Sequence, residues 1–126
     1  MKEAIQPEGL ARPAAPYSPV VVSGDHVFTA GQVAFDATGA VVAEDMDAQT
    51  RQALRNVQSC LAAAGCTLED VVKVNAYLAD LGDFDAYNSV YREFFSEPYP
   101  ARTTIQCGLA GGMRIEIDAV ARRPGG

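Results

Sequence analysis

The sequence predicts an α+β fold, a mixed sheet with two helices on one face. Two segments carry apolar residues at helical spacing, β-rich runs lie before, between and after them, and glycine-containing turns separate the runs. The predicted order is hairpin, helix, strand, helix and hairpin. We interpret residues 1–126 as a single domain, because 126 residues of which 48% are hydrophobic can bury one core without disulfide bonds.

An extended arm is expected at the N-terminus. Four prolines fall within the first nineteen residues and push each preceding residue away from helix, so regular structure should begin after Pro19. Two β-rich runs follow, at 20–22 and 27–33, with turn residues between them. They predict a hairpin, and a further turn leads into a short strand at 40–42.

Two helices and a strand are predicted for the middle of the chain. Apolar side chains recur every three or four positions up to residue 64, with Asp47 as the expected N-cap and Gly65 just after the C-cap. Residues 71–78 are rich in valine and contain no glycine or proline, which predicts a strand. The second helix begins after Asp83 and ends before Pro98. Its apolar face consists of aromatic residues: Phe84, Tyr87, Tyr91, Phe94 and Phe95.

The C-terminal third predicts a second hairpin. Residues 103–109 and 113–121 flank a turn that contains Gly111 and Gly112, and the second run alternates apolar with mostly polar residues. Glu116 is expected on the polar side of its strand. A sheet covered by helices on one side leaves its other face open, so we expect self-association. The alternative is a monomer with a polar outer face.

Composition excludes several classes of function. The chain has 16 acidic and 10 basic residues, a formal net charge of −6 and no basic run, which argues against nucleic-acid binding. No apolar stretch reaches the roughly 18 residues of a membrane span. The N-terminus lacks the basic and apolar regions of a secretory signal, so we expect a cytoplasmic protein.

Familiar catalytic and cofactor motifs are missing from the sequence. His26 is the one histidine and falls in a predicted turn, so histidine-dependent catalysis is not indicated. Cys60, Cys66 and Cys107 fit no zinc spacing, and we interpret them as free, structural thiols. Glycine-rich phosphate-binding strings are absent as well. The expected protein holds no metal and no cofactor.

Three polar residues are candidates for a functional site. Arg102 lies at the start of a predicted strand, where it could bind a carboxylate or form a structural salt bridge. Glu116 could orient a water molecule as a base, or form a cross-strand ion pair with Arg102 or Arg114. Asn88 lies one residue away from the aromatic helix face, and its plain interpretation is a surface amide.

Several blocks of the sequence resemble the reactive intermediate deaminase family, RidA/YjgF. The principal blocks are Pro-Ala-Arg-Thr-Thr-Ile-Gln-Cys-Gly-Leu at 100–109 and Ile-Glu-Ile-Asp-Ala-Val-Ala at 115–121. Further blocks occur in the same order at 15–18, 29–33, 47–51 and 87–95, so the resemblance covers essentially the whole domain. It implies a chorismate-mutase-like fold assembled as a homotrimer, with three sites in the clefts between subunits.

The resemblance also implies an activity. Family members hydrolyse small imines and enamines such as 2-iminobutanoate and 2-iminopropanoate (2-aminoacrylate) to 2-oxo acids and ammonia. By resemblance, Arg102 grips the substrate carboxylate and Glu116 lies near the attacking water. The same cleft is then lined by Tyr17, Gly31, Asn88 and Thr104.

The sequence departs from the family pattern at two positions. Ala30 stands where many members have serine, and Thr104 stands where many have cysteine. These departures concern substrate preference more than reaction class. Two other functions stay open: an endoribonuclease or translation inhibitor, as some members are labelled, and a non-catalytic trimeric protein that binds small carboxylates or acts like a chaperone.

Overall fold

The computed structural model describes residues 1–42 and 45–124. Within these ranges the chain forms six strands and two α-helices: β1 (Glu3–Ile5), β2 (Val20–Ser23), β3 (His26–Thr29), α1 (Met46–Ala63), β4 (Val71–Leu78), α2 (Phe84–Phe94), β5 (Ala101–Gln106) and β6 (Ile115–Arg122). Short 3-10 turns at Leu68–Asp70 and Leu81–Asp83 lead into β4 and α2.

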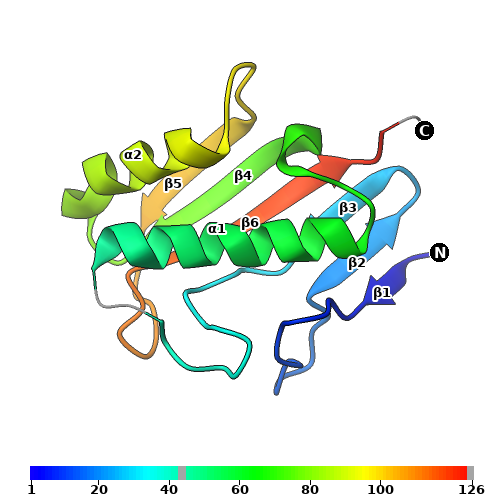
Figure 1. Ribbon diagram of the computed structural model, residues 1–126, viewed down its shortest axis with the longest axis horizontal. Helices are drawn as coiled ribbons and strands as arrows, with labels where there is room; N and C mark the ends of the chain where they lie inside the picture. Colours follow the sequence, from blue (N-terminus) through cyan, green and yellow to red (C-terminus); the bar gives the residue numbers. More distant parts are fainter. Residues whose placement is uncertain (43–44, 125–126) are drawn as a thin grey trace.

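The strands form one mixed sheet in the order β1-β2-β3-β6-β4-β5. All neighbouring pairs are antiparallel except β4 and β5, which are parallel. Both helices cover the same face of this sheet, and the opposite face carries no helix (Figure 1). The predicted fold class is therefore confirmed, and β5 forms one edge of the sheet next to α2.

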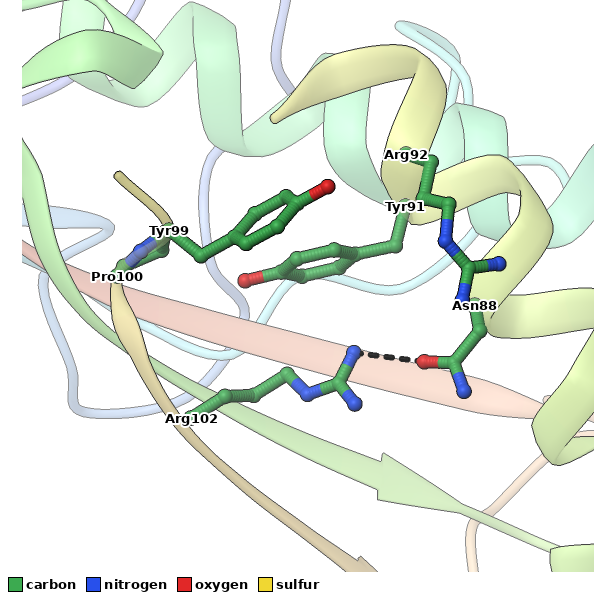
Figure 2. A pocket seen from close by; sticks show the side chains of 6 residues that line it. All are labelled: Asn88, Tyr91, Arg92, Tyr99, Pro100 and Arg102. Atoms are coloured by element: carbon green, nitrogen blue, oxygen red, sulfur yellow. Dashed lines mark hydrogen bonds between the residues drawn. The ribbon is translucent and has the colours of Figure 1, made fainter. Parts of the chain in front are cut away.

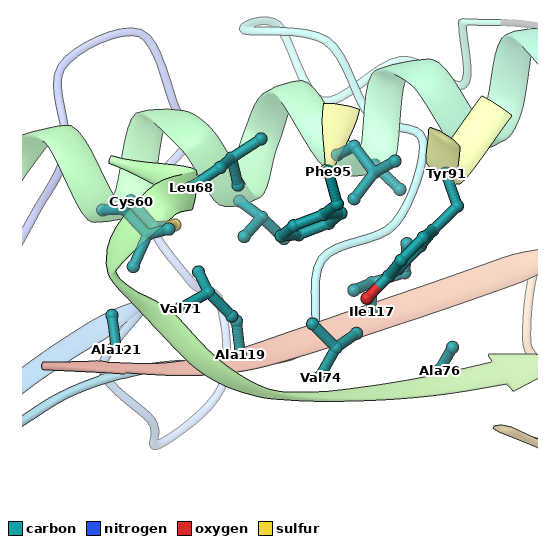
Figure 3. Packing of buried hydrophobic residues seen from close by; sticks show 14 of the residues in the cluster. Cys60, Leu68, Val71, Val74, Ala76, Tyr91, Phe95, Ile117, Ala119 and Ala121 are labelled. Atoms are coloured by element: carbon teal, nitrogen blue, oxygen red, sulfur yellow. The ribbon is translucent and has the colours of Figure 1, made fainter. Parts of the chain in front are cut away.

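The core lies between the helices and the sheet. Every second residue of β6, from Ile115 to Ala121, is buried against it, as the alternation predicts. Figure 3 shows Tyr91 of α2, and Phe95 directly after the helix, reaching down over β4 and β6, where Val74 is fully buried. The two rings stack with their centroids 4.5 Å apart. Packing of α2 on the sheet thus fixes the position of the helix relative to β4 and β5.

The start of α1 differs from the sequence prediction, whereas α2 begins directly after Asp83 as predicted. Asp45, not Asp47, is the N-cap of α1: its Oδ1 accepts a hydrogen bond from the backbone N of Ala48 over 2.8 Å. Gly65 follows the C-cap with φ +79°, as predicted. Asp83 does precede α2, but its side chain makes no capping bond and instead accepts two hydrogen bonds from Arg114, at 2.9 and 3.1 Å.

The predicted C-terminal hairpin is wrong. The alternation correctly predicts two strands, but β5 pairs in parallel with β4, and β6 lies on the other side of β4. Residues 107–114 therefore form a crossing connection and not a hairpin turn. Alternation reports which face of a strand is buried; it carries no information about the neighbouring strand.

Other strand predictions need smaller corrections. The N-terminal arm contains β1, which pairs with β2 although its three residues are largely exposed. The strand predicted for 27–33 ends at Thr29, and pairing resumes only at an isolated bridge between Gln32 and Ile117. Residues 40–42 form no strand, since only Val41 makes a bridge there. The hairpin of β2 and β3 and the whole of β4 agree with the prediction.

Candidate functional site

Arg102 points from β5 toward α2, on the helix-covered side of the sheet. Its Nη1 donates a hydrogen bond to Oδ1 of Asn88 over 2.8 Å (Figure 2). The guanidinium is half-buried, and no carboxylate of the described residues forms an ion pair with it. A structural salt bridge at Arg102 is therefore excluded within the described part of the chain, and Asn88 is more than a surface amide.

Three aromatic rings of α2 lie close to the same guanidinium. Its central carbon lies 4.7 Å from the ring centroid of Tyr91, 4.9 Å from that of Tyr87 and 5.7 Å from that of Phe84. Cations held over aromatic faces at such distances are attracted by the ring quadrupole. The guanidinium of Arg102 thus lies against aromatic rings in a half-buried place without an acidic partner among the described residues.

A pocket of about 270 Å³ opens beside Arg102. Its lining residues come from α2 and from the segment that leads into β5 (Figure 2): Asn88, Tyr91, Arg92, Tyr99, Pro100 and Arg102. The lining contains two guanidinium groups and no acidic residue, so the pocket favours an anion.

Thr104 lies two residues further along β5 on the same face. Its Oγ1 is 3.0 Å from the hydroxyl of Tyr87, so the two groups share a hydrogen bond. Burial raises the pKa of Tyr87, while the hydrogen bond to Thr104 and the charge of Arg102 act in the opposite direction. Tyr87 therefore contacts both candidate substrate-binding residues of β5.

Glu116 belongs to a second group of candidate residues. It is packed against Gly31: a Cβ added to Gly31 would lie 2.5 Å from Oε2 of Glu116. Tyr17 and Gly31 both line a smaller cavity of about 120 Å³ beside the N-terminal arm. The structure therefore brings Tyr17, Gly31 and Glu116 into one neighbourhood.

The loop that contains Gly31 is held from two sides. Gln32 exchanges two backbone hydrogen bonds with Ile117 of β6, at 2.7 and 2.9 Å. The buried amide of Asn56, on α1, donates to the carbonyl oxygens of Val33 and Phe35 at 2.9 and 2.8 Å. These contacts fix the backbone of Gly31 against the carboxylate of Glu116.

The electrostatic surroundings of Glu116 raise its pKa. Burial makes the largest contribution, and the Asp118 carboxylate, two residues along β6, adds to it. Asp118 itself accepts hydrogen bonds from Asn75 over 2.9 Å and from the hydroxyl of Tyr77 over 3.1 Å. No described cation forms an ion pair with Glu116, so the predicted alternative of a cross-strand pair with Arg102 or Arg114 is wrong.

The two groups lie on opposite faces of the sheet. Arg102 is in register with the buried Val74 and therefore shares its helix-covered face. Glu116 pairs with Tyr77 and alternates with the buried Ile115 and Ile117, which puts it on the uncovered face. One chain consequently does not bring Arg102 and Glu116 together.

His26 and the three cysteines line neither pocket. His26 is exposed at the start of β3, and all three cysteines are free, with Cys60 and Cys66 buried. In the described residues, no group of three or more His, Cys, Asp or Glu side chains is placed to hold a metal ion. Of the described helices, none combines the length and the apolar character that crossing a bilayer requires.

The sequence did not indicate the aromatic surroundings of Arg102. The spacing of Phe84, Tyr87 and Tyr91 predicts a core-facing stripe, which is correct but incomplete, because the same rings also contact Arg102. The one signal in the sequence for a polar group near these rings is the position of Asn88 beside the aromatic stripe. Nothing in the sequence pattern pointed to Tyr99 or Arg92, since they join the pocket only through the parallel pairing of β5 with β4.

Comparison with known proteins identifies the family. The family model described as Endoribonuclease L-PSP matches residues 9–123. The 2-iminobutanoate/2-iminopropanoate deaminase of Salmonella typhimurium is 38% identical over 98% of this chain and 99% of its own length. The chain belongs to the RidA/YjgF family.

Other family members share its sequence and its fold. A RutC family protein of Pyrococcus horikoshii is 44% identical, covering 96% of this chain and 98% of its own. The crystal structure of E. coli TdcF with bound serine superposes with a TM-score of 0.89 at 35% identity and covers 96% of this chain and 98% of that one. The resemblance seen in the sequence motifs is thus confirmed as family membership.

Proposed function

We propose that the protein hydrolyses small 2-imino and enamino acids, such as 2-iminobutanoate and 2-iminopropanoate (2-aminoacrylate), to 2-oxo acids and ammonia. The observation that carries this proposal is the guanidinium of Arg102, which lines an anion-favouring pocket without an acidic partner. The curated name of the Salmonella relative supports the same reaction.

Arg102 is the proposed carboxylate-binding residue. Arg102 donates a hydrogen bond to Asn88 and lies within hydrogen-bonding reach of Tyr87, and its five guanidinium N–H donors leave enough for a bidentate bond to a carboxylate. Such charge-assisted bonds contribute about 1.5–3 kcal/mol each when desolvated. Thr104 would line the same part of the site.

Glu116 is the proposed partner of the attacking water. A protonated imine is already electrophilic, so the site need only hold the carboxylate and orient a water molecule toward the C=N carbon. Water adds to that carbon, the C–N bond then breaks, and ammonia leaves with the 2-oxo acid as the other product. Glu116 either accepts a proton from the water or aligns it, and no step requires a metal or organic cofactor.

We also propose that the working form is a chorismate-mutase-like homotrimer, with each site built from two chains. The separation of Arg102 and Glu116 on opposite sheet faces supports this, because neither face alone carries both groups. The uncovered face also exposes apolar side chains, among them Phe28 at 42% and Ile105 at 47%. In the assembly, Tyr17, Gly31 and Glu116 of one chain would complete the pocket of Arg102 on a neighbour.

The direct test of the activity couples the protein to a threonine or serine dehydratase that generates imines in situ. We expect faster release of ammonia and 2-oxo acid than in buffer. Arg102→Lys keeps the charge but loses the planar fork, so kcat/KM should fall by about a hundredfold or more. Arg51→Lys is the matched control, because Arg51 pairs with Glu93 away from the pocket, and its activity should stay at the wild-type level.

Two outcomes would contradict the proposal. No acceleration over buffer would favour a non-catalytic carboxylate-binding protein. The name of the family model keeps the endoribonuclease alternative open, although the net charge of −6 disfavours binding to a polyanion. Cleavage of RNA by nuclease-free protein, lost in Arg102→Ala, would show that deamination is not the sole function.

A further inference from the structure

The side of α2 that faces β5 has a feature that core packing does not require. Tyr91 is 5% exposed and Tyr87 fully buried, yet both rings lie within 5 Å of the guanidinium carbon of Arg102. Apolar side chains would fill the same core volume without attracting a cation. We infer that Tyr87 and Tyr91 are positioning residues for Arg102; this inference rests on the proposed function.

Because β5 is an edge strand, the side chain of Arg102 needs contacts from α2 to hold it in place. β5 pairs with β4 on one side and has no strand partner on its other side among the described residues. Arg102 is a long side chain with several rotatable bonds, and leaving it free would cost binding entropy whenever a ligand ordered it. The rings restrict the guanidinium from one face, and Asn88 restricts it from one edge. The remaining N–H donors are then oriented before a ligand arrives.

Tyr91 acts on Arg102 through its ring. Its hydroxyl is buried and has no hydrogen-bond partner, and burial raises the pKa of Tyr91 to about 12. A buried hydroxyl without a partner is unfavourable for folding. The ring is what contacts Arg102 and Phe95, so the ring, and not the hydroxyl, performs the positioning.

Tyr87 extends the same support to Thr104. The Tyr87 hydroxyl shares a hydrogen bond with Thr104 Oγ1 at 3.0 Å, while its ring lies 4.9 Å from the Arg102 guanidinium carbon. One side chain of α2 thus fixes the spacing of two candidate ligand-binding residues on β5. Movement of α2 would displace both of them together.

The test measures carboxylate binding and the environment of Arg102 separately. Isothermal titration with 2-oxobutanoate gives the Kd, and the Nε–Hε resonance of Arg102 reports the ring current of the aromatic neighbours. Tyr91→Leu should weaken binding about tenfold and move the resonance downfield, while Tyr91→Phe should bind about tenfold more tightly than Tyr91→Leu. Val90→Ala is the control, because it removes buried apolar volume from the same helix at a side chain that does not line the pocket.

A double-mutant cycle separates positioning from general loosening of the fold. In an Arg102→Lys background, Tyr91→Leu should have little further effect on the Kd, because the planar group that the ring orients is gone. Equal losses in both backgrounds, or equal losses in Tyr91→Leu and Val90→Ala, would overturn the inference. Failure of the wild type to bind 2-oxobutanoate would instead contradict the proposed function, and the Arg102 resonance would still test the positioning.

Discussion

Gly31 is the residue whose small size has the clearest consequence for the site. Its backbone is not in the left-handed region, so alanine can adopt the same conformation. A Cβ there would come within 2.5 Å of Oε2 of Glu116, which is the far end of a flexible side chain and can move away. Gly31→Ala should therefore displace the carboxylate of Glu116 and leave the fold largely unchanged.

For Gly31→Ala we expect a loss of stability below about 1 kcal/mol and a decrease in kcat of about 10- to 100-fold. Thermal unfolding and the coupled imine assay measure the two effects. Gly108→Ala is the control, because a Cβ at Gly108 meets nothing within 4 Å. Wild-type kcat in Gly31→Ala would show that the position of Glu116 is not critical.

The raised pKa of Glu116 predicts how activity depends on pH. A base or water-orienting carboxylate acts in its ionised form, so kcat/KM should rise as the pH passes through the pKa of Glu116, which lies above that of an ordinary glutamate. Asp118→Asn removes the nearby negative charge, lowers the pKa of Glu116 and should move this rise to lower pH. Asp47→Asn, at the surface of α1, should leave the profile in place. A profile unchanged by Asp118→Asn would show that another group controls it.

Residue identities in the site could be predicted from the sequence only through the family motifs. Periodicity alone left Arg102 open between a salt bridge and a ligand-binding role, because a strand pattern does not reveal whether an acid lies opposite. The contacts of Arg102 with aromatic rings could not be predicted either. Tyr91 lies 11 residues earlier in α2, and only the packing of α2 beside β5 brings its ring to Arg102.

For the helices and strands, local sequence patterns predicted where each element begins and ends better than they predicted which strands pair. The limits of β4 agree with the prediction because the segment is rich in valine, contains no glycine or proline and is bounded by turns. The pairing of β5 with β4 was missed because the two strands are separated by α2. β1 was missed because a three-residue edge strand needs little hydrophobic pattern.

The N-cap of α1 gives a prediction for this scale. Asp45 accepts a hydrogen bond from Ala48, whereas Asp47 lies inside the first turn. Asp45→Ala should lower the free energy of unfolding by about 1 kcal/mol, and Asp47→Ala by less, because only a favourable charge near the helix N-terminus is lost there. Chemical denaturation of both variants measures the difference. A larger loss of unfolding free energy in Asp47→Ala than in Asp45→Ala would show that Asp47 is the N-cap.

For the whole molecule, the division of the site between two sheet faces predicts complementation between chains. Arg102→Ala and Glu116→Ala should each be inactive alone. Co-expressed at equal levels, they should form mixed trimers in which about one site of the three combines an intact Arg102 with an intact Glu116. The coupled assay on mixed oligomers isolated through two different tags measures this recovery.

The control for this experiment is co-expression of two differently tagged Arg102→Ala chains, which should remain inactive. Absence of recovery in verified mixed oligomers would place both groups of a site on one chain and contradict the shared cleft. Sedimentation of the wild type at about three times the 13.3 kDa chain mass is the accompanying expectation.

For the proposed site shared between chains, turnover should depend on protein concentration, because Arg102 and Glu116 lie on opposite sheet faces of each chain. Each chain has its own buried core and would keep its structure after the subunits separate, but its Arg102 and its Glu116 would then lie in two separate, incomplete sites. Specific activity should then decline on dilution while the circular dichroism signal persists. A compound that binds the open sheet face and keeps the chains apart would inhibit the reaction without competing with substrate.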